Sequence, residues 1–549
     1  MRISKKGVVL LGSLFAAGFL DPFASCAVLA VDIGQNFLAS TYGQDSTATP
    51  ADANGAVGVK YYVEFINGRL TVFNKANAAK VQTMTDLLFW SRAGVTIQRD
   101  WDVTDPRIIY DPTVGRWFAS EVDFDTTSTV NINHFLLAVS SSADPTGPWS
   151  GFSIASDPGG NNFADFPTLG LDANGVYLSG DLFDANNNPV GPTLLSIPKA
   201  DLLAQPPSIA RRTWLGVLSY ANHGTVLQPA VCLDGGGGGN LLAVQDLGLD
   251  FQSHFSLVLS QVESAAGPGS ATLSAATSIR VPAYTSPPSP SQPNSRLSID
   301  DGDARFSAFV YRVGDEIFAV HSTQVNNLAA IRWYRINALN HALLESGTIA
   351  DPSLDLFYPS IAANTNGTVV IAYSGSSSSV FISDYAVVGE TVSGVTTFGS
   401  PILLQSGTAS YSDGSFGTSR WGDYSTTTVD PSNPSRFWTI QMFPSGPSAW
   451  STQVTELLTA SPRLVASTTG ANLVLSWSSL AGPFQLNTSA GLGADASWSP
   501  VAQPAATNNG VVSVSVPLTG GGGFFRLQPM AAGAGPGPVA NALSFRTAH

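Results

Sequence analysis

A short hairpin pattern recurs along most of the chain and constrains its fold more than any other feature. Each copy has a proline or small residue, a short apolar strand, a turn with Asp or Asn and often Gly, and a second strand rich in aromatic residues. In four copies, which begin at Pro106, Pro167, Pro229 and Pro359, the Asp or Asn follows the proline by five residues. Internal repetition of this kind predicts a repeat architecture.

Three further segments, residues 56–65, 306–320 and 422–440, follow the pattern more loosely and bring the number of hairpins to seven. The spacing leaves room for two more strands in each repeat, such as residues 135–140 and 149–154 after the second hairpin. A hairpin cannot bury its faces alone. Seven related units therefore predict an all-β fold, a seven-bladed β-propeller over residues 51–457. Stacked β-sandwiches are the alternative, but they would not need a shared pattern.

The pattern changes after Leu457. Residues 463–467, 472–477, 484–487, 511–516 and 524–527 are short alternating segments separated by turn residues. They predict a small β-sandwich over residues 458–528. We expect residues 31–50 to be an N-terminal extension, and residues 529–549, rich in Ala, Gly and Pro, to be a flexible tail.

The N-terminus has the order of a secretory signal. Arg2, Lys5 and Lys6 precede an apolar run over residues 8–20 and then small residues. Residues 1–30 are therefore predicted to be a signal peptide, and the protein to be secreted, periplasmic or on the cell surface. Lipid anchoring through Cys26 is the lesser alternative, because Leu is absent three residues before it. No apolar run is long enough to cross a bilayer.

The charge balance excludes one class of partner. The chain has 25 Lys and Arg against 39 Asp and Glu, a net charge of −14, and its basic residues form no run outside the first six positions. Nucleic-acid binding depends on clustered Lys and Arg. We therefore expect no nucleic-acid partner, and we expect a monomer.

Several motifs resemble a widespread group of secreted bacterial β-propeller proteins. They are Gly-Ala-Val-Gly at 55–58, Asp-Pro at 105–106, Asp-Pro-Thr-Gly at 144–147 and Ser-Arg-Trp-Gly-Asp-Tyr-Ser at 419–425. The resemblance covers roughly residues 50–457 and implies the propeller fold, but it brings no activity with it. The C-terminal part is similar to the Ig-like or fibronectin type III-like modules that end many bacterial extracellular proteins.

Polar residues recur near the ends of the second hairpin strands. Equivalent positions of different blades converge at the mouths of a propeller's channel, so this recurrence predicts a polar ring around a pocket. The alternative is ordinary solvation of strand ends. The residues are Glu64, Glu121, Asp181, Gln245, His321, Ser374 and Gln441.

A second set lies where the first strands begin: Asp105, Asp165 and Asp423, with Arg420 beside the last. Carboxylates on neighbouring blades could supply the acid and the base, or nucleophile, of glycoside hydrolysis. The alternative, stronger for Asp105, is that an Asp beside Pro or Gly caps a turn.

From both sets we select candidates for a site that acts on a glycan. His321 and Arg420 would also suit a polysaccharide lyase, as base and as partner of a uronate carboxylate. The catalytic candidates are Glu64, Glu121, Asp181, His321 and Asp423, and the substrate-binding candidates are Arg420, Trp421, Tyr424, Gln245 and Gln441.

Calcium is the one cofactor for which the sequence offers ligands. Oxygen-rich segments at 300–303, at 184–188 and at Asp123 and Asp125 suit a hard cation. None has EF-hand spacing, so Asx turns are the alternative.

These features favour an exported propeller that binds an extracellular polysaccharide and has the residue types to cleave it, as a glycoside hydrolase or a polysaccharide lyase. The alternative is a non-catalytic cell-surface or matrix interaction protein. Fold alone does not decide between them, because propellers serve both purposes.

Overall fold

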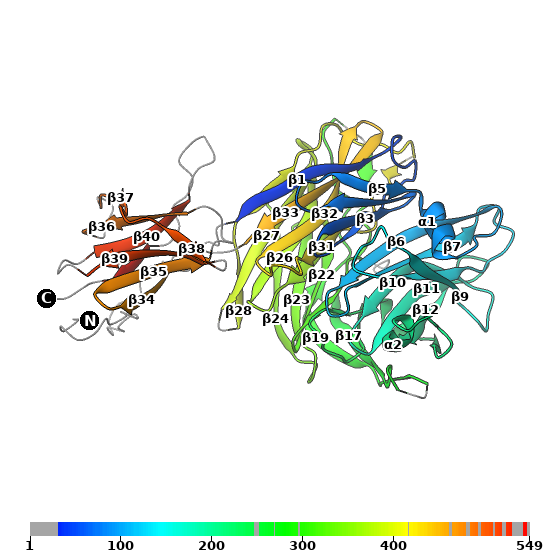
Figure 1. Cartoon of the computed structure of the whole chain (residues 1–549). Helices are drawn as coiled ribbons and strands as arrows, with labels where there is room; N and C mark the ends of the chain where they lie inside the picture. Colours follow the sequence, from blue (N-terminus) through cyan, green and yellow to red (C-terminus); the bar gives the residue numbers. More distant parts are fainter. Residues whose placement is uncertain are drawn as a thin grey trace. The chain divides into compact units, whose positions relative to one another are not determined.

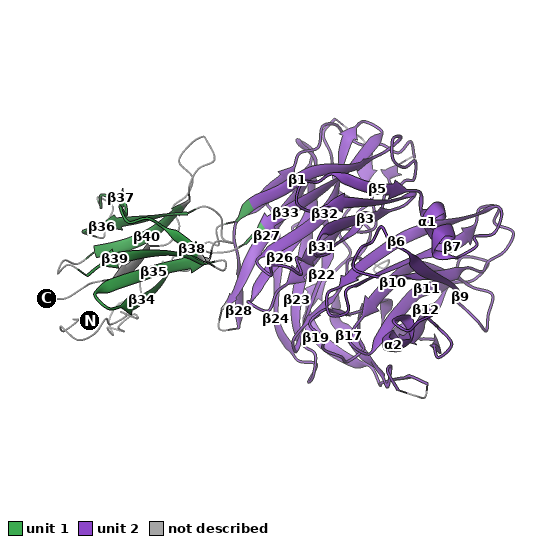
Figure 2. Cartoon of the chain, viewed as in Figure 1, with its two compact units in different colours: residues 1–32, 458–549 green, residues 33–457 purple. Residues whose placement is uncertain are grey.

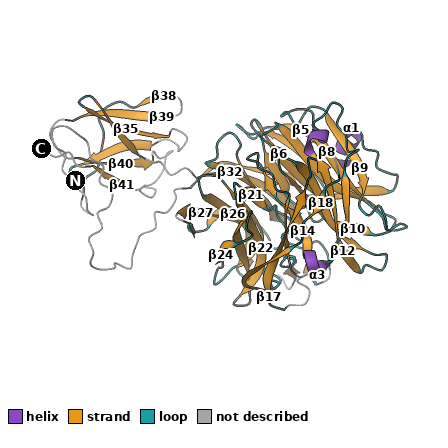
Figure 3. Cartoon of the chain, turned by 90° about the horizontal axis from the view of Figure 1, so that it is seen from below, coloured by secondary structure: helices purple, strands orange, loops and turns teal. Residues whose placement is uncertain are grey.

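The computed structural model describes residues 31–545 except 246–251, 268–269, 295–296, 393, 416, 460–463, 479–483, 492–495, 509–510, 519–522 and 530–541. The chain divides into two compact units, residues 33–457 and residues 1–32 with 458–549 (Figure 2). Strands make up nearly all the regular structure, and the helices are short (Figure 3). Among the described residues, no helix is long and apolar enough to span a membrane.

In the described part of residues 33–457, antiparallel strands form seven successive blades (Figure 1). The first strands of successive blades contact one another and form the inner ring of a β-propeller. Between the fourth and fifth blades this contact is made by β15 (Val231–Cys232), which pairs with the first strand of the fifth blade. The first three blades are β2 (Asn54–Val57), β3 (Tyr61–Ile66), β4 (Arg69–Asn74) and β5 (Lys80–Met84); β6 (Trp101–Asp111), β7 (Arg116–Asp125), β8 (His134–Ser140) and β9 (Trp149–Ala155); and β10 (Phe163–Leu171), β11 (Gly175–Phe183), β12 (Pro189–Pro198) and β13 (Thr213–Val217).

The next three blades continue this order. They are β14 (Thr225–Pro229), β16 (Asn240–Val244), β17 (His254–Glu263) and β19 (Thr277–Tyr284); β21 (Tyr311–Val313), β22 (Glu316–Val325), β23 (Leu328–Asn337) and β24 (Leu343–Ile349); and β25 (Asp355–Ala363), β26 (Thr368–Ser377), β27 (Val380–Val392) and β28 (Val395–Phe398). The shorter elements are α1 (Asp86–Ala93), α2 (Lys199–Leu202), α3 (Tyr220–His223), β15 (Val231–Cys232), β18 (Thr272–Leu273), β20 (Ser298–Ile299), β29 (Ile402–Gln405) and β30 (Thr418–Ser419).

The seventh blade closes the ring with the N-terminal strand. It consists of β31 (Thr426–Val429), β32 (Arg436–Gly446), β33 (Ala449–Leu458) and, outermost, β1 (Asp32–Thr41). The Tyr42 N–H donates to the Trp450 carbonyl over 2.9 Å, and the Gln35 N–H donates to Glu456 Oε2 over 3.0 Å. Most of residues 31–50, expected as an extension before the propeller, therefore belong to the propeller unit, which begins at Ile33.

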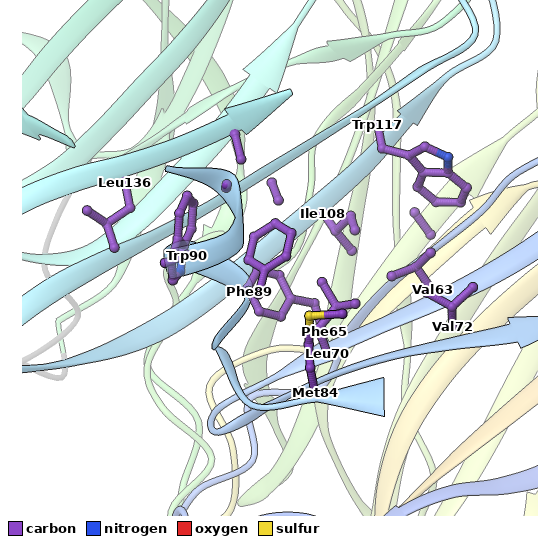
Figure 4. Close-up of a cluster of buried hydrophobic side chains, with 14 of the residues drawn as sticks. Val63, Phe65, Leu70, Val72, Met84, Phe89, Trp90, Ile108, Trp117 and Leu136 are labelled. Carbon is purple, nitrogen blue, oxygen red and sulfur yellow. The ribbon is translucent and has the colours of Figure 1, made fainter. Parts of the chain in front are cut away.

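Facing blades bury apolar side chains between them. Between the first two blades, Val63, Phe65, Ile108 and Trp117 pack together, and Trp90 of α1 covers one side (Figure 4). Far from the starts of the first strands, β15 pairs in parallel with both β10 and β21 through Val231, which ties three blades together at the inner ring. The hairpins and the all-β propeller predicted from the sequence are confirmed.

The C-terminal unit is a sandwich of two sheets, as predicted. One sheet has the order β34 (Val465–Thr469), β35 (Asn472–Ser478), β39 (Val511–Pro517) and β38 (Ala506–Asn508), and the other β37 (Ser499–Pro500), β36 (Phe484–Ser489), β40 (Gly523–Pro529) and β41 (Ala542–Phe545). Leu475 and Trp477 of one sheet and Leu486 and Leu527 of the other share one core. Residues 529–549, expected to be a flexible tail, include β41, which pairs with β40. Residues 1–30, with Cys26, lie outside the described residues.

Candidate functional site

The same backbone irregularity marks the first strand of five blades. A non-glycine residue with a positive φ between 45° and 64° lies in the first half of four of these strands and two residues before the fifth, β2. In four of the five blades the pairing register with the second strand shifts at this point, as at a β-bulge. A bulge re-aims side chains, so residues of different blades meet at one end of the ring. The residues are Asp52, Asp105, Phe166, Val226 and Tyr358.

Two long loops meet at the same end. The loop before β21 and the loop before β31 pair in parallel, Ser298 with Thr418 and Ile299 with Ser419. The Asp300 N–H then donates to the Ser419 carbonyl over 2.9 Å. This pairing brings the acidic segment 300–303 next to Arg420.

The bulges and the paired loops enclose a pocket of about 460 Å³, which we call the channel-mouth pocket. Its lining is mainly polar, and Phe166 and Tyr358 are the aromatic residues among the described residues that line it. The other lining residues are Thr49, Pro50, Asp52, Asn67, Thr104, Asp105, Asp165, Asp300, Asp301, Gly302, Asp303, Arg305, Ser307, Ser322, Arg420 and Asp423.

Two arginines on the pocket wall pair with some of its carboxylates. Arg305 donates two hydrogen bonds to Asp303, Nε to Oδ1 over 2.8 Å and Nη2 to Oδ2 over 2.6 Å. Arg420 Nη2 donates to Asp423 Oδ2 over 2.7 Å, and its Nε lies 3.5 Å from Asp300 Oδ2. Charge-assisted pairs of this kind hold side chains in fixed positions.

Arg107 and Tyr424 lie inside the inner ring beside the pocket. The Arg107 guanidinium carbon lies 3.5 Å from the centroid of the Tyr424 ring, and its nitrogens donate to the carbonyls of Pro167 and Ser307 over 3.1 and 2.9 Å. The Tyr424 hydroxyl donates to Asp105 Oδ2 over 2.7 Å. Arg107 is fully buried, so its charge acts on these carboxyls through a medium with little water.

Burial shifts the proton affinity of the pocket's carboxyls. It raises the pKa of Asp105 to about 7, with the charges of Asp165 and Asp423 adding to the effect. It raises the pKa of Asp301 to about 9, with Asp300 as the next cause. Burial also raises the pKa values of Asp52 and Asp423. At neutral pH the pocket therefore holds both acidic protons and negative charge.

A second cavity of about 660 Å³ adjoins the channel-mouth pocket and shares Thr49, Asn67 and Thr104 with it. We call it the side cavity. Its wall includes Leu87, at the start of α1, and Phe124 of β7. Thr85 caps α1 by accepting the Leu88 N–H on its side-chain oxygen. The two cavities are therefore neighbours on this part of the propeller.

The ten candidates named from the sequence fall into three groups. Asp423 and Arg420 line the channel-mouth pocket. Tyr424 and Asp181 are its neighbours: Tyr424 bonds to Asp105, and Asp181 pairs across strands with Asp165. Burial raises the pKa of Asp181 to about 7.

The second-strand glutamates lie between blades instead of at the pocket. Glu64 is fully buried and accepts the Ser40 hydroxyl over 2.6 Å and the Thr452 hydroxyl. Glu121 is also fully buried and accepts the Trp90 indole N–H. Neither residue is among those that line the pocket.

The other four candidates are also outside the pocket. His321 is enclosed by aromatic rings and bonds to the Tyr334 hydroxyl over 2.9 Å, and burial lowers its pKa to about 4. Trp421 packs in a buried apolar cluster. Gln441 is buried, and its Nε2 donates to Thr439 Oγ1 over 3.1 Å. Gln245 is exposed and accepts the Ser256 hydroxyl.

The oxygen-rich segments do not form a metal centre. Asp184 Oδ1 accepts the N–H groups of Asn186 and Asn188 over 2.8 and 2.9 Å, and Asp125 Oδ1 accepts the Thr127 N–H over 2.9 Å, as in Asx turns. In the part of the chain that the structure describes, no group of three or more His, Cys, Asp or Glu residues is arranged to hold a metal ion.

Sequence reasoning missed Asp52, Asn67, Arg305 and Tyr358 as pocket residues. It singled out Asp105, Asp165 and Asp423, with Arg420 beside the last, as one set and residues 300–303 as another, without joining them. The shared position after each blade's loop could have identified Asp52 as the equivalent of Asp105. No sequence pattern marks Arg305 as a pocket residue, because its position at the pocket depends on how the loop before β21 folds.

No family model and no curated protein matches the chain. It is similar to solved structures that include a protein of unknown function from Dyadobacter fermentans, at 13% identity over 67% of this chain and 97% of that chain, with a TM-score of 0.34. Another is a Trypanosoma rangeli sialidase in complex with sialic acid, at 10% identity, 81% and 87% coverage and a TM-score of 0.33. A third is an exo-beta-1,3-galactanase from Phanerochaete chrysosporium with galactose, at 12% identity, 93% and 99% coverage and a TM-score of 0.30. Likenesses this weak say nothing about activity.

Proposed function

We propose that the chain is an exported β-propeller that binds a unit of an extracellular polysaccharide in the channel-mouth pocket and hydrolyses a glycosidic bond there. One observation carries the proposal. The pocket gathers carboxyls in different states, with Asp105 close to its titration point at neutral pH and Asp423 paired with Arg420. A polar, concave site with many hydrogen-bonding groups suits a polyhydroxylated ligand.

The two carboxyls fit the two roles of hydrolysis. One group must protonate the leaving oxygen, and the other must activate water or attack the sugar. Asp105 is the proposed acid, because its pKa of about 7 lies near the working pH and the Tyr424 hydroxyl fixes its Oδ2. Asp423 is the proposed base or nucleophile. Arg420 holds its Oδ2, and Asp52 accepts its backbone N–H over 2.8 Å.

Polysaccharide lyase chemistry fits less well. His321, which would be the base, is fully buried among Tyr284, Phe306 and Tyr334. A uronate would also bring a further negative charge into a pocket already lined by seven aspartates. Hydrolysis of a glycan without uronic acids is therefore the reaction that we propose.

The side cavity supports a polymeric ligand. Both cavities lie within the usual size range of small-molecule sites, about 300–1,000 Å³, and they share three lining residues. A sugar chain with one unit in the pocket would place its next units against Leu87 and Phe124. We propose that the C-terminal sandwich, as an Ig-like or fibronectin-like module, acts as a spacer or accessory binder.

The test compares Asp105→Asn and Asp423→Asn with wild type on a panel of neutral, amino-sugar and uronate polysaccharides. New reducing ends report hydrolysis, and the absorbance of unsaturated uronates reports a lyase. We expect reducing ends only, and a loss of at least about 100-fold in kcat for each variant. Glu64→Gln is the matched control and should keep its activity, because Glu64 lies outside the pocket.

Two outcomes would contradict this proposal. Binding without product, in wild type and variants alike, would favour the non-catalytic interaction protein. If the protein binds no glycan in the panel, the proposal that its ligand is a glycan is wrong.

A further inference from the structure

The channel-mouth pocket has far more acidic than basic groups. Seven aspartates line it against two arginines, Arg305 and Arg420, and the buried Arg107 adds one more positive charge nearby. Buried carboxylates without counterions are costly, so such a group either keeps its proton or meets a cation. These three arginines are too few to neutralise seven aspartate carboxylates.

Two residues that line the pocket each have a buried polar atom without a hydrogen-bond partner among the described residues. The atoms are Asp301 Oδ2 and the Tyr358 hydroxyl oxygen, and the two residues are only 4% and 5% exposed. Their neighbours are satisfied: Asp303 pairs with Arg305, and Asp300 Oδ1 accepts the Gly302 N–H over 3.0 Å. Because unpartnered buried polar groups are rare and costly, these two point to a ligand that forms hydrogen bonds with them.

We infer that the channel-mouth pocket binds a protonated primary amine on the glycan, which makes the ligand a polysaccharide of amino sugars with free amines. An ammonium group has three N–H donors, enough for Asp301 Oδ2 and the Tyr358 oxygen together. Its charge also offsets part of the carboxylate excess. An N-acetylated sugar lacks this charge. The inference rests on the proposed function and specifies its substrate class.

Amine binding should release protons from the pocket. The positive charge of an adjacent ammonium lowers the pKa of Asp301, which burial raises to about 9, so the Asp301 carboxyl loses its proton when the ammonium enters. The charged and titratable groups in and beside the pocket come from every wall: Asp52, Asp105, Arg107, Asp165, Asp181, Asp300, Asp303, Arg305, Asp355, Tyr358, Arg420, Asp423 and Tyr424.

The experiment is calorimetric titration of the full chain with glucosamine oligomers and with N-acetylglucosamine oligomers of equal length. Each titration is run at one pH in two buffers of different ionisation enthalpy. We expect the free-amine oligomers to bind at least about tenfold more tightly. The binding enthalpies measured in the two buffers should differ by the number of protons released multiplied by the difference between the ionisation enthalpies of the buffers.

Two variants and a control locate the amine. Asp301→Asn keeps the shape but removes the charge, and should lose at least about tenfold in affinity for the amine oligomers. Tyr358→Phe should also lose affinity for the amine oligomers, but by a smaller factor. Asp100→Asn, at a side chain that is 63% exposed, should change nothing. Thermal melting of each variant checks its fold, and Tyr358→Phe carries the test if Asp301→Asn does not fold.

The outcomes separate this inference from the proposed function. If the acetylated oligomers bind with equal affinity, or if both variants keep the wild-type affinity, the inference that the pocket binds an amine is wrong. The proposed hydrolysis of a glycan is not affected by either result. If the protein binds spermidine tightly but binds no glycan, the amine that it recognises is not on a sugar. This result would contradict the proposed function as well.

Discussion

Glu64 and Asp301 are both buried carboxyls, yet their surroundings give them different uses. The hydroxyls of Ser40 and Thr452 satisfy both oxygens of Glu64, which lies between the first and last blades. Asp301 faces a cavity and has an oxygen without a partner. Burial raises the pKa of both groups. For Glu64 this shift affects stability alone, whereas for Asp301 it also affects what the pocket can bind.

The Glu64 shift predicts a pH dependence of stability. Burial raises its pKa from 4.5 to about 7, so its protonated form favours the folded state. The resulting stabilisation is complete below pH 4.5 and is lost as the pH rises through 7. A shift of this size corresponds to about 3 kcal/mol. The glutamine side chain in Glu64→Gln cannot ionise. The unfolding free energy of this variant should therefore fall less between pH 5 and pH 7.5 than that of wild type, and the two falls should differ by up to this amount.

Urea unfolding at the two pH values measures this difference. The other buried carboxyls, such as Asp181, are present in both proteins, so their contributions cancel in the comparison. Parallel pH profiles for wild type and Glu64→Gln would show that the Glu64 carboxyl does not titrate in this range.

The strands could be predicted from the sequence, but the directions of some side chains could not. The proline, turn and aromatic pattern located the hairpins, because strand alternation is a local property. The bulges at Asp105 and Phe166 are not visible in that pattern, and they turn first-strand residues to the pocket. The second-strand glutamates, expected around a mouth, instead lie between blades. Loop residues such as Asp301 and Arg420 meet only because β20 and β30 pair.

At the element scale, α1 gives the side cavity an apolar surface that a sugar ring could cover. Leu87 is 39% exposed and lies in the first turn of the helix. Leu87→Ala should weaken the binding of long oligosaccharides by about 1 kcal/mol, or about fivefold, and leave the binding of a single sugar unit unchanged. Titration with oligomers of increasing length measures this, with Leu339→Ala, at a residue 64% exposed, as the control. An equal loss for the single sugar would argue against a chain that extends into the side cavity.

The two ends of the propeller pair with each other in the seventh blade. The seven-blade order could be predicted because the hairpin repeats along the sequence, but ring closure by β1 could not, because residues 31–50 carry no hairpin pattern. In the structure, β1 covers β33, and Ala39 packs with Trp438, Ile440 and Val454. Without β1, the edge of β33 would be exposed, with unpaired backbone groups.

Two truncations test this closure against the separate C-terminal unit. A chain that begins at Tyr42 loses the β1 pairing and the Ala39 contacts, and its propeller should melt at least about 5 °C lower than that of the full chain. A chain that ends at Leu457 loses a compact unit with a core cluster of its own, which among the described residues extends from Leu464 to Leu527, so the propeller's melting temperature should not change. Differential scanning calorimetry of the three chains gives the comparison. Equal melting temperatures for the full chain and the chain without β1 would mean that the ring is held by the blade-to-blade contacts, with no need for the terminal strand.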